Sequence, residues 1–148
     1  MDDRNLTIDL CERLGQLDGW AWSPDYDPDV YTNEVVAVFY GRIRPSPDKA
    51  VGVRVYGGSD DVDTDSKTRR VQLRSRGASG NADDADVIAD AAHDLFKSLL
   101  REGVISEVTR TSFSPLGADD SQREERTDNY LVVFDNSEAV TNPEESTP

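Results

Sequence analysis

The chain of 148 residues has the length of one domain, and a domain of this size buries enough apolar surface to fold without disulfides or a structural metal. Its 30 acidic and 16 basic residues give a net charge of −14, which argues against free nucleic acid as a partner. Cys11 is the single cysteine and no apolar run approaches the ~18 residues that span a bilayer, so we expect a soluble protein of a reducing compartment, without a signal peptide.

Lysine contributes only 3 of the 16 basic residues. A dense carboxylate surface suits a high-salt cytoplasm, because the salt screens the repulsion between like charges. A halophilic source is therefore one hypothesis. A GC-rich genome that encodes arginine in place of lysine is the alternative.

An amphipathic helix is predicted near the start of the chain, over residues 5–17, with Asn5 or Asp3 as its candidate N-cap. Its apolar face recurs at steps of three and four and consists of Leu6, Leu10, Leu14 and Leu17. The next segment, 18–31, is rich in Asp, Pro and aromatic residues and is interpreted as an irregular connector whose Trp20 and Trp22 pack on the core.

Three strands are predicted in the next part of the chain. Residues 34–43 have the β-branched and aromatic content of a strand, and the two prolines of 44–49 end it. Segments 50–56 and 69–76 each alternate apolar and polar residues, which is typical of strands with one buried face. The residues between these two strands are expected to form a flexible acidic loop.

The best helical pattern of the sequence lies at 82–100, where Asn81 is the candidate N-cap. We expect the apolar stripe of this helix to pack on the inward face of the strands. The stripe consists of Ile88, Ala91, Ala92, Leu95, Phe96 and Leu99.

Two further strands are predicted at 104–113 and 129–135. The second is apolar on both faces, which is typical of a central strand covered on both sides, here by the N-terminal helix or by another subunit. The intervening residues 114–130 exceed the length of a hairpin turn and are interpreted as a projecting charged connection. Residues 136–148 have no periodicity and are expected to form a disordered acidic tail.

These elements predict one α+β domain over residues 1–135. Its sheet is expected to be mainly antiparallel, with about four strands, and to carry the N-terminal helix and one long central helix.

The candidate chemical groups of the sequence favour structural roles. His93 is assigned to packing or solvent contact, and Cys11, on a leucine-rich helix, is assigned to a buried inert thiol. Asp61, Asp63 and Asp65 have the spacing that begins a calcium loop, but the turn glycine and the bidentate glutamate of that motif are absent. No nucleophile elbow or phosphate loop is present, so we expect no catalytic residue, no cofactor and no metal.

Arginines are concentrated in the middle of the chain, where 9 of the 16 basic residues fall between Arg42 and Arg76. On the two middle strands the arginines are predicted to point away from the helix-covered face. Ion pairs within the chain are one interpretation, and they are worth little each. The other is a subunit interface, in which arginines of one copy meet carboxylates of the next.

Four segments occur in a consistent order over residues 40–135: "GRIRPSPDKAVGVRVYGGS", "RRVQLRSRGAS", "ADVIADAAHDLFKSLL" and "SPLGADDSQREERTDNYLVVF". This succession resembles the minor capsid or tail terminator (head–tail joining) proteins of long-tailed viruses. The matching points are Pro47-Asp48, Arg76-Gly77, the 82–100 helix, Pro115, Gly117, Asp119 or Asp120, Arg123 and Asn129-Tyr130.

The resemblance implies a virion structural protein without catalysis, assembled in the host cytoplasm. It would form a homo-oligomeric ring, typically hexameric, that caps the tail tube protein and joins it to the head–tail connector or neck protein. The genome would pass through the lumen without sequence-specific contact, and no membrane partner is implied. A haloarchaeal virus is the first expectation for the source and an actinobacterial phage the second.

A closed ring needs two different patches that meet head to tail, and the arginine strands and acidic loops are the candidates. The predicted interface residues are Arg54, Arg70, Arg74, Arg76, Asp119, Asp120, Arg123 and Arg126. Two alternatives remain open at this point. One is a head-completion or neck protein of the same virion, and the other is a small cellular binding or regulatory domain.

Overall fold

The computed structural model describes residues 2–61, 63–64, 66–101 and 105–135. Within these residues the chain forms two helices and six strands, with single 3-10 turns at Pro28–Val30 and Leu99–Arg101. The elements are α1 (Asp3–Gly15), β1 (Trp20–Trp22), β2 (Val36–Tyr40), β3 (Ala50–Asp60), β4 (Ser66–Arg76), α2 (Asp84–Ser98), β5 (Ile105–Ala118) and β6 (Glu124–Asp135).

The strands form one mixed sheet in the order β1-β2-β3-β4-β6-β5. The first three strands pair in parallel, and the other pairs are antiparallel. The predicted α+β class is confirmed, but the expected sheet of about four strands is too small, because the sheet has six strands and a parallel part. β1 was predicted as irregular connector. A strand of three residues shows no period in the sequence, and only its pairing with β2 defines it.

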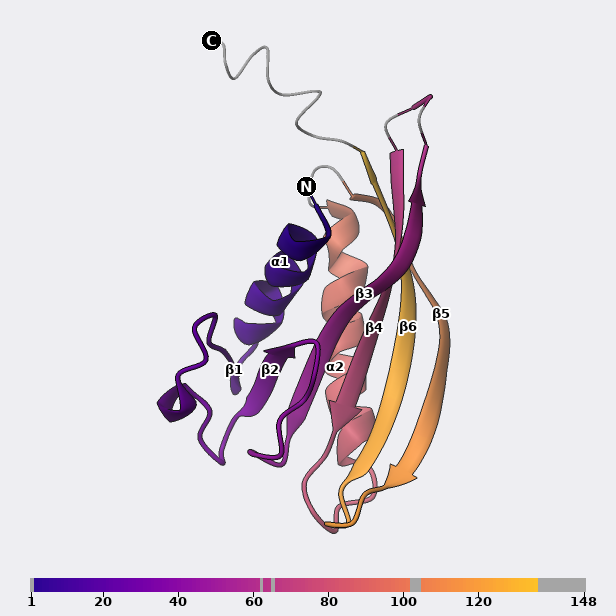
Figure 1. The fold of residues 1–148 in the computed structure, drawn as a ribbon. Helices are drawn as coiled ribbons and strands as arrows, with labels where there is room; N and C mark the ends of the chain where they lie inside the picture. The colour runs from indigo at the N-terminus through magenta and orange to yellow at the C-terminus, as the bar shows by residue number, and fades with distance from the viewer. Residues whose placement is uncertain (1, 62, 65, 102–104, 136–148) are drawn as a thin grey trace.

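Both helices pack on the same face of the sheet, as Figure 1 shows. The core between the layers is formed by the predicted leucine face of α1, by one face of the strands and by the inward side of α2. Ile88, Ala92, Phe96 and Leu99 of the predicted stripe are buried, while Ala91 and Leu95 are half-buried. The stripe is confirmed in its main part.

The helix caps differ from the predicted ones. Oδ1 of Asp2 accepts from the backbone N–H of Asn5 at 2.7 Å, so Asp2 is the N-cap of α1 in place of Asn5 or Asp3. α2 begins at Asp84, after the N-cap residue Asp83, so Asn81 does not cap it. The carboxylate of Asp84 instead accepts from the N–H of Ala78 at 2.8 Å and holds the preceding turn.

β6 occupies the predicted central position, between β4 and β5. Its inward residues Tyr130, Val132 and Phe134 are 0–1 % exposed. Leu131 and Val133 lie on the opposite face and are half-buried. The expectation that the N-terminal helix covers this second face is wrong, because α1 lies on the same side as α2.

The interpretation of 114–130 as a long projecting connection is also wrong. β5 continues to Ala118 and β6 starts at Glu124, so the connection is the five-residue turn 119–123 of a long hairpin. The strands are hidden in the sequence because their residues here are polar and because β5 contains bulges, one of them between Pro115 and Gly117. β3 and β4 likewise extend into the predicted acidic loop, to Asp60 and from Ser66.

The predicted disordered tail, 136–148, lies outside the described residues, and the domain boundary at 135 stays a prediction. No helix among the described residues is long and apolar enough to cross a membrane.

Candidate interaction surfaces

No helix of the described residues covers one face of the sheet, and we call the outward side of β3, β4, β6 and β5 the open face. Arg54, Arg70 and Arg74 meet on it, as the sequence predicted. Arg54 of β3 stands opposite Gln72 of β4, so Arg70 and Arg74 are its two diagonal neighbours. Diagonal neighbours in an antiparallel pair have Cβ atoms up to about 7–8 Å apart, so we call Arg54, Arg70 and Arg74 together the basic patch.

The charges of this patch are incompletely balanced within the chain. Nε of Arg74 lies 2.7 Å from Oε1 of Glu125, and the Arg74 side chain remains 52 % exposed. Arg54 and Arg70 are exposed, and neither forms an ion pair with a carboxylate of the part of the chain that the structure describes. A chain of net charge −14 thus presents unpaired cations on an uncovered sheet face.

A concave region of about 530 Å³ lies between the open face and the segment 41–43, and we call it the arginine groove. The segment crosses close to the sheet at Gly52, where a Cβ atom would lie 2.3 Å from the carbonyl oxygen of Gly41. Arg42 was missed as a site residue, because it lies in a loop, where no periodicity gives a side chain a direction. The groove is lined by Gly41, Arg42, Ile43, Gly52, Arg54, Gln72, Arg74, Arg76 and Glu125.

Arg76, which the sequence assigned to the interface, is only 5 % exposed and holds the loop before β3. Its Nε donates to the carbonyl of Asp48 at 2.8 Å, and its Nη2 donates to the carbonyls of Arg44 and Pro47 at 2.9 and 2.7 Å. Burial and the neighbouring Arg123 lower the pKa of Arg76. Its role in the structure is therefore internal.

The hairpin turn 119–123 is tied to the same loop by Arg123. Asp119 organises the turn, because its Oδ1 accepts from the N–H groups of Ser121 and Arg123, both at 2.9 Å. These bonds, with the Arg123 guanidinium 2.9 Å from Oδ2, lower the pKa of Asp119. Arg123 also donates to the carbonyl of Pro45 at 2.7 Å, whereas Asp120 is exposed at the tip of the turn.

Arg126 lies on the helix-covered side of the sheet, away from the open face. Its Nε is 2.8 Å from the carboxylate of Asp128, which is 1 % exposed, and its Nη1 is 2.9 Å from Asp86 of α2. The hydrogen bonds to these carboxylates raise the pKa of Arg126. Its guanidinium also lies 4.7 Å from the ring centroid of Phe113. The eight predicted interface residues thus do not share one surface.

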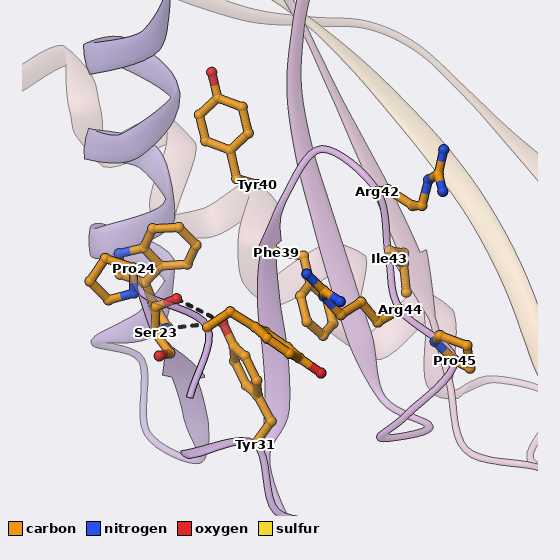
Figure 2. Close-up of a pocket in the computed structure, with 11 residues that line it drawn as sticks. Ser23, Pro24, Tyr31, Phe39, Tyr40, Arg42, Ile43, Arg44 and Pro45 are labelled. Atoms are coloured by element: carbon orange, nitrogen blue, oxygen red, sulfur yellow. Dashed lines mark hydrogen bonds between the residues drawn. The ribbon is translucent and has the colours of Figure 1, made fainter. Parts of the chain in front are cut away.

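A second concavity, of about 450 Å³, lies on the other side of the 41–45 segment (Figure 2). Tyr31 forms its base: the hydroxyl donates to the carbonyl of Val38 at 2.8 Å and accepts from the N–H of Ser23 at 2.9 Å. The Tyr31 ring packs on Phe39, with centroids 4.8 Å apart. The guanidinium of Arg44 lies 3.6 Å from the ring centroid of Tyr26 at the rim.

Of the two groups that the sequence assigned to structural roles, Cys11 lies in the interior and His93 is half-buried. Cys11 is fully buried, as predicted, and burial raises the pKa of its thiol to about 12. Nδ1 of His93 lies 3.0 Å from the hydroxyl of Tyr130, and burial lowers the pKa of His93. No group of three or more His, Cys, Asp or Glu side chains among the described residues could hold a metal ion.

A family model described as bacteriophage tail terminator protein matches residues 13–136, which is most of the chain. The match includes all six strands, helix α2 and the 41–45 segment that separates the two concave regions. No curated protein matches the chain.

Proposed function

The chain belongs to the bacteriophage tail terminator family and is a structural component of a viral tail, and on this premise we propose that it forms a ring that caps the tail tube and joins it to the head connector. The ring is hexameric, as the sequence resemblance implies, and its lumen passes the genome. The family match favours a tail terminator over the head-completion and cellular-domain alternatives.

The observation that carries the ring proposal is a sheet face that no helix of the described residues covers, on which Arg54 and Arg70 have no ion-pair partner among those residues. Charged groups on such a face are suited to a partner of opposite sign, and another copy of this chain, with its net charge of −14, can supply one. A closed ring needs a heterologous interface, in which a patch of one copy meets a different patch of the next. The basic patch is one half of such a pair.

In this proposal, only some of the predicted interface residues contribute directly to the subunit contact. Arg54, Arg70 and Arg74 contribute to the subunit contact, and Asp120 contributes through the exposed hairpin turn. Arg76, Arg123 and Asp119 act indirectly, since their bonds fix the loops beside the groove.

The end of the sheet that carries the 41–49 loop and the 119–123 turn is our candidate for contact with the tail tube or the connector. Arg123 joins these two loops, and Arg76 anchors the 41–49 loop to β4. A surface whose loops are held in one conformation loses little entropy when it binds, which suits a contact that must form once and persist.

A tube-length assay tests this function. Tail tube protein of the same virion is polymerised with and without the purified chain, and tube ends are viewed by electron microscopy. The proposal predicts rings at tube ends and a shorter, narrower length distribution. Unchanged tube lengths, together with bare tube ends, would contradict it.

A further inference from the structure

We propose that the patch facing the arginines in the ring is the outward ridge of helix α2 on the next copy. This inference rests on the proposed ring and names the partner surface of the open face. The ridge consists of Asp83, Asp86, Asp90 and Asp94.

The four carboxylates lie on one side of α2 because they are spaced by three, four and four residues. The inward side of the helix is marked by Ala85, Ile88, Ala89, Ala92 and Phe96, all buried. The ridge therefore points away from the sheet. Asp86 and Asp94 keep 62 % and 78 % of their side-chain surface exposed, although Asp86 contacts Arg126 and Asp94 lies 3.6 Å from Lys97.

α1 is a poorer candidate for this partner. Its acidic residues are interspersed with Arg4 and Arg13, and two of them, Asp3 and Asp9, form ion pairs with Arg69 and Arg13. Along α2, in contrast, no lysine or arginine precedes Lys97. The outward side of α2 thus presents a nearly uninterrupted row of negative charge.

The last three carboxylates of the ridge span a length similar to that of the two arginines on β4. Arg70 and Arg74 are four residues apart on a strand, which corresponds to about 13 Å at the ~3.3 Å rise of a strand. Asp86 and Asp94 are eight residues apart on a helix, which corresponds to about 12 Å at the ~1.5 Å rise of a helix. Two straight rows of this kind can run side by side, so that each arginine meets a carboxylate.

The positions of the two rows also agree with a ring. α2 packs over β4 and β6 on one side of the sheet, and the arginines stand on the other side of β3 and β4. Each copy thus carries its acidic row on one layer and its basic row on the opposite layer. When the helix layer of one copy stacks on the open face of the next, the copies are joined head to tail. In a closed ring, every copy then uses both its acidic and its basic row.

Exposed ion pairs are individually weak. We therefore expect these pairs to determine which two faces meet, and to supply only part of the affinity. Val87, which is 58 % exposed beside the ridge, and Tyr56, which is 49 % exposed beside the arginines, add apolar contact on the two sides.

A charge-swap experiment on the full chain tests the pairing. One variant carries Arg54→Glu and Arg70→Glu, and the other carries Asp90→Arg and Asp94→Arg. Each variant alone places like charges in the contact, and we expect each to lose the ring. In a 1:1 mixture the acidic open face of the first variant can meet the basic ridge of the second, and the unchanged face of the second can meet the unchanged ridge of the first. All contacts are then between opposite charges when the two variants alternate. We therefore expect rings with equal numbers of the two variants in native mass spectra.

A matched control carries Glu12→Arg and Asp18→Arg, two exposed acidic positions outside α2. It has the same change of net charge as the ridge variant, and we expect it to assemble as the wild type does. The unfolding midpoint of every variant is measured, so that a misfolded protein is recognised.

The outcomes separate the two proposals. A wild-type chain that forms rings, combined with a ridge variant that still assembles by itself, would overturn α2 as the partner and leave the ring intact. A wild-type chain that forms no ring, alone or on tail tubes, would contradict the ring itself.

Discussion

Arg123 lies against Asp48 across two loops: its Nη1 is 3.2 Å from Oδ1 of Asp48. This contact joins the hairpin turn after β5 to the loop before β3. Arg76, on β4, donates to three carbonyls of the loop before β3. The wall of the arginine groove is therefore held by hydrogen bonds within the chain, and the cations that remain for a partner are those on the open strands.

Replacement of Arg76 by Met should destabilise the fold. The change leaves the carbonyls of Arg44, Pro47 and Asp48 without their donor, and each unsatisfied buried group costs about 1–3 kcal/mol. Since the loop can relax towards water, we expect a loss of about 3 kcal/mol in the free energy of unfolding, measured by urea denaturation. Arg70→Met is the matched control, for which a surface change predicts a shift within about 0.5 kcal/mol. Equal effects of the two variants would show that the loop is not held in this way.

Replacement of Tyr31 by Phe tests the base of the pocket in Figure 2. The hydroxyl is bonded to the N–H of Ser23 and to the carbonyl of Val38, so its removal should lower the free energy of unfolding by about 2 kcal/mol. Tyr56→Phe, at a side chain that is 49 % exposed, should have almost no effect. A Tyr31→Phe protein as stable as the wild type would mean that these bonds contribute nothing.

The sequence was sufficient for the parts of the fold in which apolar residues repeat. The leucines of α1, the stripe of α2 and the alternation at 50–56 and 69–76 all report a buried face, and the structure buries them. The outward direction of Arg54, Arg70 and Arg74 followed from the same alternation.

Long-range pairing determines the parts that the sequence did not reveal. β1 exists because Trp20–Trp22 pairs with β2, and the polar ends of β5 and β6 are strands because they pair with each other. Arg76 shows the same limit, because alternation gives its side chain a direction but does not reveal the loop that covers it. Arg126 was assigned to a connection, and only strand pairing places it on β6, next to α2.

Stability should depend on pH through His93. Burial lowers its pKa, and Arg110 and Lys97 lower it further, while Asp94 and Asp128 oppose the shift. The unfolded chain then binds a proton at a higher pH than the folded one, so stability is complete above about pH 6.5 and falls as the pH drops from there towards the folded pKa.

The measurement compares urea denaturation at pH 7.5 and pH 5.5 for the wild type and for His93→Gln. We expect the wild type to lose more stability between these two pH values than the variant loses. Identical losses would exclude His93 as the titrating group.

Salt should stabilise this chain. Its net charge of −14 gives repulsion among surface carboxylates, and the screening length falls from about 10 Å at 0.1 M to about 3 Å at 1 M salt. We expect the thermal midpoint to rise between 0.1 M and 2 M KCl, with a smaller rise for Asp90→Asn/Asp94→Asn. A midpoint that is unchanged or lower in KCl would argue against a halophilic source.

The most direct test of the central claim, that copies of this chain assemble through the open face, is the native mass of the protein with and without its unpaired arginines. The wild type and an Arg54→Glu/Arg70→Glu variant are measured at equal concentration, with Arg4→Glu on α1 as a control. If copies assemble through the open face, the wild type and the control form a closed ring, and the double variant is a folded monomer. A double variant that forms the same ring as the wild type would contradict it.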